Sequence, residues 1–254
     1  MFLTIDLNAD LGEGFGGSSS AADEQLLGIV SSANVACGFH AGDAATMQRT
    51  IRVARERGVA IGAHPSYPDI PGFGRRELGL SPREIEHHVS YQIDSLSEVC
   101  VAEGAALVYV KPHGALYNRA AWDPQAAKAI VRAIRGENPA LTLLGLPACE
   151  MSRAAEEGSV RYANEAFVDR AYTSDGRLAP RTAPDAVIHD AGVAVERAMT
   201  MVADGTVVAI DGSKLHIDAQ SLCVHGDNPA APAILRELRK RLTDSGIKIA
   251  PFAA

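Results

Sequence analysis

The sequence lacks the features that mark membrane, secreted and nucleic-acid-binding proteins. None of its 254 residues fall in an apolar run of the ~18 residues that would span a membrane, and it does not open on a signal-peptide pattern. Its 24 Lys and Arg are outnumbered by 31 Asp and Glu, so the basic excess of a nucleic-acid-binding protein is absent. Blocks of like charge and low-complexity runs are also absent, and 47% of the residues are hydrophobic, which excludes disorder. We therefore expect a globular protein with no membrane or nucleic-acid partner.

Cysteine is scarce and scattered. The four cysteines are Cys37, Cys100, Cys149 and Cys223, and they form no C-x-x-C pair. This spacing favours reduced thiols over a disulfide framework or a zinc knuckle. Together with the lack of a secretion signal, it predicts a cytoplasmic protein.

The familiar phosphate-binding loops are missing as well. No Gly-x-x-x-x-Gly-Lys-Ser/Thr motif occurs, and the glycines between Gly12 and Gly17 do not have the Gly-x-Gly-x-x-Gly spacing. The sequence therefore provides no support for a nucleotide site of either kind in this chain.

What the sequence does contain is a regular alternation of strand and helix patterns. Seven short, nearly continuous apolar runs are typical of strands buried on both faces of a parallel sheet. They cover residues 2–7, 32–36, 59–63, 106–111, 141–146, 160–164 and 222–224.

Helix signals lie between these runs. Ser81-Pro82-Arg83-Glu84 is a capping box, and it precedes apolar residues spaced three or four apart, so a helix should begin there. Further helices are expected over 44–57, 123–135, 149–158, 184–204 and 228–245, and a hairpin over 207–217. About seven strand–helix units without a dividing linker predict one α/β domain over residues 1–254, either a β/α barrel or a doubly wound sheet.

Polar residues gather after the expected strands. The C-terminal ends of the strands in a β/α barrel carry the active site, so these residues should share one rim. In chain order they are Asn8, Asp10, Glu13, His40, Asp43, His64, Lys111, His113, Glu165, Asp169, Arg170, His225 and Asp227. Asp43 and Asp227 stand equally well where helix caps are expected.

Histidines with a carboxylate admit two kinds of chemistry. Asp10, His40, His64 and His113 could hold a divalent metal that activates water, or they could act as general acids and bases without a metal. Their spacing matches no short zinc motif, so both alternatives stay open.

The segment over 65–80 is long for a strand–helix connection and combines three prolines with flexible glycines, which predicts a lid. Arg75 and Arg76 within it suit a substrate carboxylate or phosphate. The alternative is a solvated loop with an ion pair to Glu77.

The residues at the strand ends resemble the signatures of the LamB/YcsF family, whose members act as the A subunit of 5-oxoprolinase. The matching blocks are DLNADLGE (6–13), NVACGFHAGD (34–43), GAHP (62–65), GFGRR (72–76), KPHGALYN (111–118), EAFVDR (165–170) and CVHGDN (223–228). The resemblance implies a variant, TIM-like β/α barrel of about seven strands, similar to glycoside hydrolase and deacetylase barrels.

The resemblance also implies an activity and partners. It implies ATP-dependent hydrolytic opening of 5-oxoproline (pyroglutamate) to glutamate, together with subunits B and C, with ATP used by the complex and phosphorylation of the lactam oxygen activating the carbonyl carbon. Asp10 or Glu13 would be the general base, and Lys111 and Arg170 would hold developing negative charge. The three histidines would position water, a proton or a divalent metal. The residues expected to bind substrate are Asn8, Asp43, Arg75, Arg76, Asp169, Arg170, His225 and Asp227.

Two other functions compete with this one. A stand-alone metal-dependent amidohydrolase or deacetylase would use the same rim without ATP. A non-catalytic subunit would bind a partner or a small acidic ligand, but such a subunit has less need of so many clustered ionisable groups.

Overall fold

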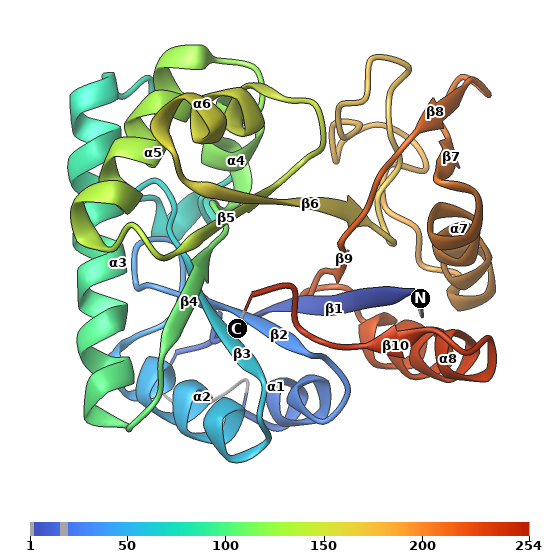
Figure 1. The fold of residues 1–254 in the computed structure, drawn as a ribbon, viewed down its shortest axis with the longest axis horizontal. Coiled ribbons are helices and arrows are strands. Elements are labelled where there is room, and N and C mark those ends of the chain that lie inside the picture. The colour runs from blue at the N-terminus through green and yellow to red at the C-terminus, as the bar shows by residue number, and fades with distance from the viewer. Residues whose placement is uncertain (1–2, 16–19, 254) are drawn as a thin grey trace.

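The computed structural model describes residues 3–15 and 20–253, and seven parallel strands in this part of the chain close into a barrel (Figure 1). The strands pair in the order β1-β2-β3-β4-β5-β6-β9, and β9 pairs with β1 to complete the circle. Their bounds are β1 Thr4–Leu11, β2 Ser32–Ala36, β3 Ala60–His64, β4 Leu107–Val110, β5 Thr142–Gly145, β6 Arg161–Phe167 and β9 Ser221–Val224. A short strand, β10 (Lys248–Ile249), pairs in parallel with the start of β1. A barrel, and not a doubly wound sheet, is therefore the fold.

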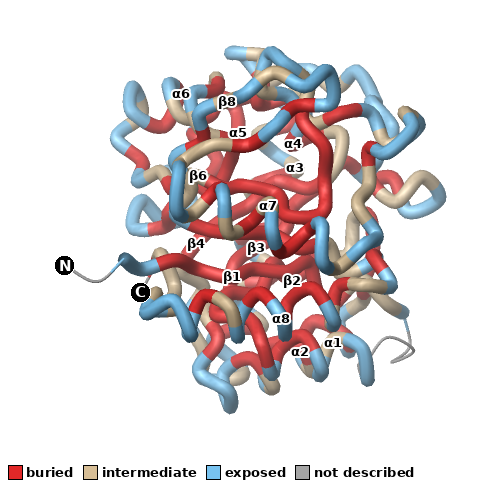
Figure 2. Tube along the Cα trace, turned by 90° about the vertical axis from the view of Figure 1, so that its right-hand side faces the viewer, coloured by how far each residue is buried: buried red, intermediate tan, exposed pale blue. Residues whose placement is uncertain are grey.

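Helices surround the barrel. They are α1 (Ser20–Leu27), α2 (Ala44–Glu56), α3 (Pro82–Ala102), α4 (Gly114–Ala120), α5 (Pro124–Glu137), α6 (Glu150–Gly158), α7 (Ala191–Asp204) and α8 (Ala231–Asp244). Figure 2 shows buried strands at the centre and helices whose outer faces are exposed. The capping box predicted for α3 is present: Ser81 Oγ accepts from the Glu84 amide, and the Glu84 carboxylate accepts from the Ser81 amide.

The first strand alternates between apolar and polar side chains, which corrects the expectation of a continuous apolar run. Its apolar side chains, such as Leu7 and Leu11, belong to the main hydrophobic core. Its polar side chains point into the barrel. Asn8 on β1 donates to Glu165 on β6 at 3.0 Å, and because β9 lies between these two strands, this hydrogen bond crosses the barrel interior. The main apolar core therefore lies between barrel and helices, while β1 places polar side chains in the barrel interior.

Asp6 is a buried carboxylate of β1. Its carboxylate accepts hydrogen bonds from the hydroxyls of Ser31 and Ser32, each at 2.6 Å, and from that of Ser221. Burial nevertheless raises the pKa of Asp6 to about 6, because the three hydroxyls only partly replace lost hydration.

A glycine makes room for the buried ring of Tyr109. A Cβ on Gly62 would lie 2.1 Å from the Tyr109 ring, so only glycine fits at this position of β3. The Tyr109 hydroxyl donates to Asn34 Oδ1 at 2.7 Å, and Asn34 in turn donates to Asn8 and Asp10. This chain of side chains fills the barrel and supports the residues above it.

Several boundaries differ from the predicted ones. β1 runs to Leu11, so Asn8 and Asp10 lie on the strand and not after it, while Phe2 lies outside the described residues. α7 begins at Ala191, where Asp190 caps it, and not at 184. α8 begins at Ala231, three residues later than expected.

Other elements were either confirmed or missed. The predicted hairpin is confirmed as the antiparallel pair β7 (Thr206–Val208) and β8 (Lys214–His216). α1, α4 and β10 were not predicted. Among the described residues, none of the helices has the length and apolar character needed to cross a membrane.

Candidate active site

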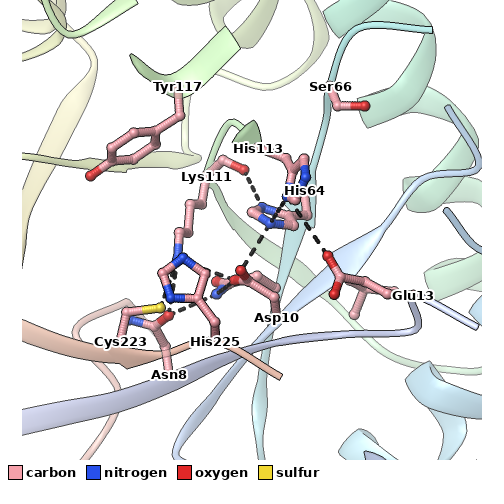
Figure 3. A network of polar contacts seen from close by, with 12 residues as sticks. Asn8, Asp10, Glu13, His64, Ser66, Lys111, His113, Tyr117, Cys223 and His225 are labelled. Atoms are coloured by element: carbon pink, nitrogen blue, oxygen red, sulfur yellow. Dashed lines mark hydrogen bonds and ion pairs between the residues drawn. The ribbon is translucent and has the colours of Figure 1, made fainter. Parts of the chain in front are cut away.

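A cavity of about 650 Å³ opens at the C-terminal ends of the barrel strands. Its floor carries side chains from β1, β3 and the residues that follow β4 and β9 (Figure 3). These are Asp10, His64, Lys111, His113 and His225. Five of the predicted rim residues therefore meet at one place.

Lys111 is buried in the floor between two carboxylates. Its Nζ lies 2.8 Å from Glu165 Oε1, 3.2 Å from Asp10 Oδ1 and 3.0 Å from Cys223 Sγ. Although burial disfavours the ammonium, the neighbouring acids, Asp10 foremost, hold the pKa of Lys111 well above its usual value. Burial likewise opposes ionisation of Asp10, but Lys111 and His64 outweigh it and hold the Asp10 pKa well below its usual value. The floor thus contains a fixed ammonium beside a fixed carboxylate.

Three histidines and one glutamate converge beside this lysine. Glu13, His40, His64 and His113 each offer one ligand atom, and these atoms lie within 4.8 Å of one another. His113 Nδ1 is 3.0 Å from His64 Nε2, and His40 Nε2 is 3.3 Å from Glu13 Oε1. The rings of His40 and His113 stack at 3.8 Å. The carboxylate of this group is Glu13, whereas the sequence pattern had suggested Asp10.

The outer nitrogens of the same histidines are all engaged. His64 Nδ1 lies 2.7 Å from the Lys111 carbonyl, and His113 Nε2 lies 2.9 Å from the Phe73 carbonyl. A carbonyl can only accept, so both of these nitrogens carry the proton. His64 Nε2 and His113 Nδ1 therefore face each other as lone pairs. Burial, together with the other histidines, lowers the pKa of His113 well below its usual value, which disfavours a further proton between them.

The loop over 65–80 closes over this cluster. Phe73 meets the rings of His40 and His113 edge-on, with ring centroids 5.5 and 5.4 Å apart. A Cβ on Gly74 would lie 2.9 Å from both histidines, and the residue has a φ of +64°, so glycine is required on both counts. The loop thereby shields the cluster from solvent on one side.

His225 is oriented by a buried carboxylate. Its Nδ1 lies 2.9 Å from Asp169 Oδ1, and its ring stacks on Phe167. Burial opposes the charge on Asp169, but His225 outweighs it and lowers the Asp169 pKa. His225 Nε2 has no hydrogen-bond partner within residues 3–15 and 20–253, and the residue lines the cavity. This arrangement is typical of an imidazole held ready to transfer a proton.

The remaining predicted residues divide into two groups. Arg75 and Arg170 line the cavity, Asn8 lies 3.4 Å beneath Lys111 Nζ, and Asp227 pairs with Arg75. Two others have structural partners instead. Asp43 caps α2 by accepting from the Thr46 amide. Arg76 pairs with the buried Asp69, and neither arginine of the loop pairs with Glu77, which instead contacts Arg119.

Some residues of the site were assigned no role from the sequence. Glu165 lies within β6 and contacts Lys111; it was expected at the rim, but without a role of its own. Arg181 lies in the long connection between β6 and α7, and its position next to Asp227 has no local sequence signal.

The fold is a parallel β/α barrel, a class of fold that also occurs in a deacetylase of known structure. The catalytic domain of a peptidoglycan N-acetylglucosamine deacetylase from Eubacterium rectale superposes with a TM-score of 0.55 at 9% identity, covering 99% of this chain and 89% of that one, which is a likeness of fold alone. Within this class, the LamB/YcsF family model matches residues 5–254, and the chain belongs to the LamB/YcsF family.

Two relatives are similar over almost their whole length. A relative from Agrobacterium fabrum, named as a 5-oxoprolinase A subunit, is 49% identical over 250 residues, which is 98% of each chain. The crystal structure of the lactam utilization protein from Thermus thermophilus is 43% identical with a TM-score of 0.92, covering 98% of this chain and all of that one.

Proposed function

We propose that this chain is the A subunit of a 5-oxoprolinase and opens the ring of 5-oxoproline to give glutamate, together with subunits B and C. The names of its relatives support the reaction. In this molecule the main support for the reaction is the position of Lys111. It is fixed between Asp10 and Glu165 at the cavity floor, next to three convergent histidines. The absence of a phosphate-binding loop motif supports a division of labour in which the partner subunits handle ATP.

The donor set at the floor fits a divalent metal ion. Two lone pairs face each other 3.0 Å apart, where a cation would satisfy both and a proton is disfavoured. Glu13 and His40 complete a set of one oxygen and three nitrogens, and the outer nitrogens are held as they are in metal sites. When bound there, such an ion would polarise a carbonyl oxygen or lower the pKa of a water molecule.

The chain's own residues can perform the other steps of ring opening. Water adds to the lactam carbonyl carbon, the ring C–N bond breaks, and the ring nitrogen takes up a proton. Asp10 lines the cavity and its Oδ2 has no partner among the described residues, so this oxygen can hold the attacking water. Lys111 Nζ stabilises negative charge on the carbonyl oxygen. His225 Nε2, with its ring fixed by Asp169, takes the proton that the attacking water loses and passes it to the leaving nitrogen.

The test is an add-back assay in extract from cells that lack this chain and retain the partner subunits. With 5-oxoproline and ATP supplied, glutamate should appear only when the pure chain is added. The His113→Ala variant should fail, and His87→Ala, an exposed histidine on α3, should restore full activity. Thermal unfolding of both variants, with His113→Gln as a milder change, separates loss of activity from loss of fold.

Two outcomes would overturn the proposal. Amide cleavage by the pure chain without ATP would make it a stand-alone metal-dependent hydrolase, which the histidine cluster would also serve. Glutamate formation that does not depend on the added chain would leave it only a binding role.

A further inference from the structure

The ring of Phe167 contacts two functional groups at the cavity floor. Phe167 ends β6 and lines the cavity, and neither the sequence nor the ring-opening steps above give it a role. Its ring stacks on the imidazole of His225, with centroids 5.2 Å apart and planes 21° from parallel. Lys111 Nζ lies over the same ring, 5.1 Å from its centroid. One aromatic ring therefore adjoins both the group that moves the proton and the ammonium that stabilises charge on oxygen.

Neighbouring side chains hold this ring in place. Phe167 is only 2% exposed, and Tyr117 meets its ring edge-on, with centroids 5.7 Å apart and planes at 88°. The Phe167 amide donates to the Tyr172 hydroxyl at 2.8 Å, which fixes the backbone. The hydrogen bond from His225 Nδ1 to Asp169 holds one atom of the imidazole, and the stack on Phe167 sets the plane of that ring. Together these two contacts determine where His225 Nε2 points.

The face of an aromatic ring also attracts positive charge, because its quadrupole places negative potential above and below the ring. Lys111 is a cation before and during ring opening, so its attraction to the Phe167 ring is the same in both states and does not change the rate. His225 differs, because it becomes an imidazolium only after it has taken the proton from water. Stabilising a charge that appears only during the reaction raises kcat.

We infer that Phe167 is a positioning residue whose ring face stabilises the imidazolium that His225 forms during ring opening. The inference rests on the proposed function, which places the transferred proton on His225. Charged side chains from three other positions surround this pair of rings, namely Asp10 on β1, Lys111 after β4 and Asp169 after β6. They stay in place when only the Phe167 ring is altered. A phenyl ring that merely filled space would leave the charge on His225 unaffected, so the two roles predict different results.

The first test replaces Phe167 with pentafluorophenylalanine in the purified full chain. This residue has nearly the shape of phenylalanine, but its fluorines reverse the sign of the ring quadrupole. NMR of the His225 ring signals, assigned by their loss in His225→Gln, should show a titration midpoint lower by about 0.5–1 pH unit than in the wild type. The same replacement at Phe252, whose ring contacts Tyr109, is the matched control. An unchanged midpoint, or an equal change in the control, would overturn the inference.

The second test measures turnover with subunits B and C supplied in excess. The fluorinated chain should form glutamate with a kcat about three- to tenfold lower, which is the same free energy expressed as a rate, and with an unchanged KM for 5-oxoproline. Phe167→Leu, which has no ring, should lower kcat at least as much, and it serves instead if the fluorinated chain melts earlier in thermal unfolding.

The two tests separate failure of this inference from failure of the proposed function. A kcat of the fluorinated chain within about twofold of the wild type would refute the role of Phe167 alone, because glutamate release would still support the proposed function. No glutamate from the wild-type chain would refute the proposed function. The NMR titration needs neither partner subunits nor turnover, so it would still decide whether the Phe167 ring stabilises the imidazolium.

Discussion

Asp6 offers a direct test of how the polar barrel interior affects stability. Its carboxyl pKa is about 6 in the folded chain, against an ordinary value of 3.8. Because the folded state holds the proton more tightly than the unfolded state, Asp6 stabilises the fold at low pH, and this contribution is lost as pH rises through 6. The full shift of about two pKa units is equivalent to about 3 kcal/mol.

The perturbation is Asp6→Asn, which removes the titration and keeps a side chain of the same shape among the three serine hydroxyls. Between about pH 5 and about pH 7 the wild type should lose about 1.3 kcal/mol of unfolding free energy relative to the variant. Urea denaturation at a series of pH values measures this difference, and other titrating groups cancel because both proteins contain them.

The same experiment contains its own control. Ser32 donates to Asp6 at 2.6 Å and favours the ionised form, so Ser32→Ala should move the midpoint of the pH dependence upward. The reasoning would be refuted if the difference in unfolding free energy between the wild type and Asp6→Asn stayed constant across this pH range. It would mean that the hydroxyls compensate fully for the buried charge.

Three further predictions concern the floor and the packing of the barrel. Lys111→Met leaves two buried carboxylates without their cation and should lower the unfolding free energy, measured by urea denaturation, by about 3–5 kcal/mol. The control Lys128→Met, at an exposed lysine, should have little effect in the same assay. After treatment with a chelator, the chain should bind about one zinc ion in calorimetry, and the His64→Ala variant should lose this binding. Equal zinc binding by both proteins would show that the histidine cluster is not the metal site. Gly62→Ala places a Cβ against the Tyr109 ring and should lower stability by about 1–3 kcal/mol in thermal unfolding, and an unchanged melting temperature would contradict the packing described.

The elements predicted best from the sequence are those with local signals. The helix after Ser81 follows from its capping box and its apolar spacing, and the hairpin around Asp211-Gly212 follows from its turn residues. The end of β1 was missed because Asn8 and Asp10 are polar, and a polar strand interior contradicts the usual rule that buried strands are apolar. α4 was missed because it has seven residues and His113 provides no side-chain cap.

The site was predicted in its location and only partly in its pairings. Strand ends converge in any parallel barrel, so the histidines and Lys111 could be expected at one rim. Which carboxylate joins the histidines depends on loop conformation, and Glu13 takes the place suggested for Asp10. Arg76 was wrongly grouped with its neighbour Arg75, because adjacent residues in an irregular loop can point in opposite directions.

Closure of the barrel by β1 and β9 has a consequence for how the chain acquires its site during folding. These two strands come from opposite ends of the sequence, with Asn8 paired to Cys223 in the register. Contacts between such distant segments form late, because a long loop must close first. Until they form, Lys111 lacks part of its charged surroundings, since Asp10 comes from the first strand and Glu165 from the sixth. A nascent chain that ends before β9 thus cannot display the assembled floor, so ring-opening capability should arise abruptly with the last strand, and not gradually as the polypeptide lengthens.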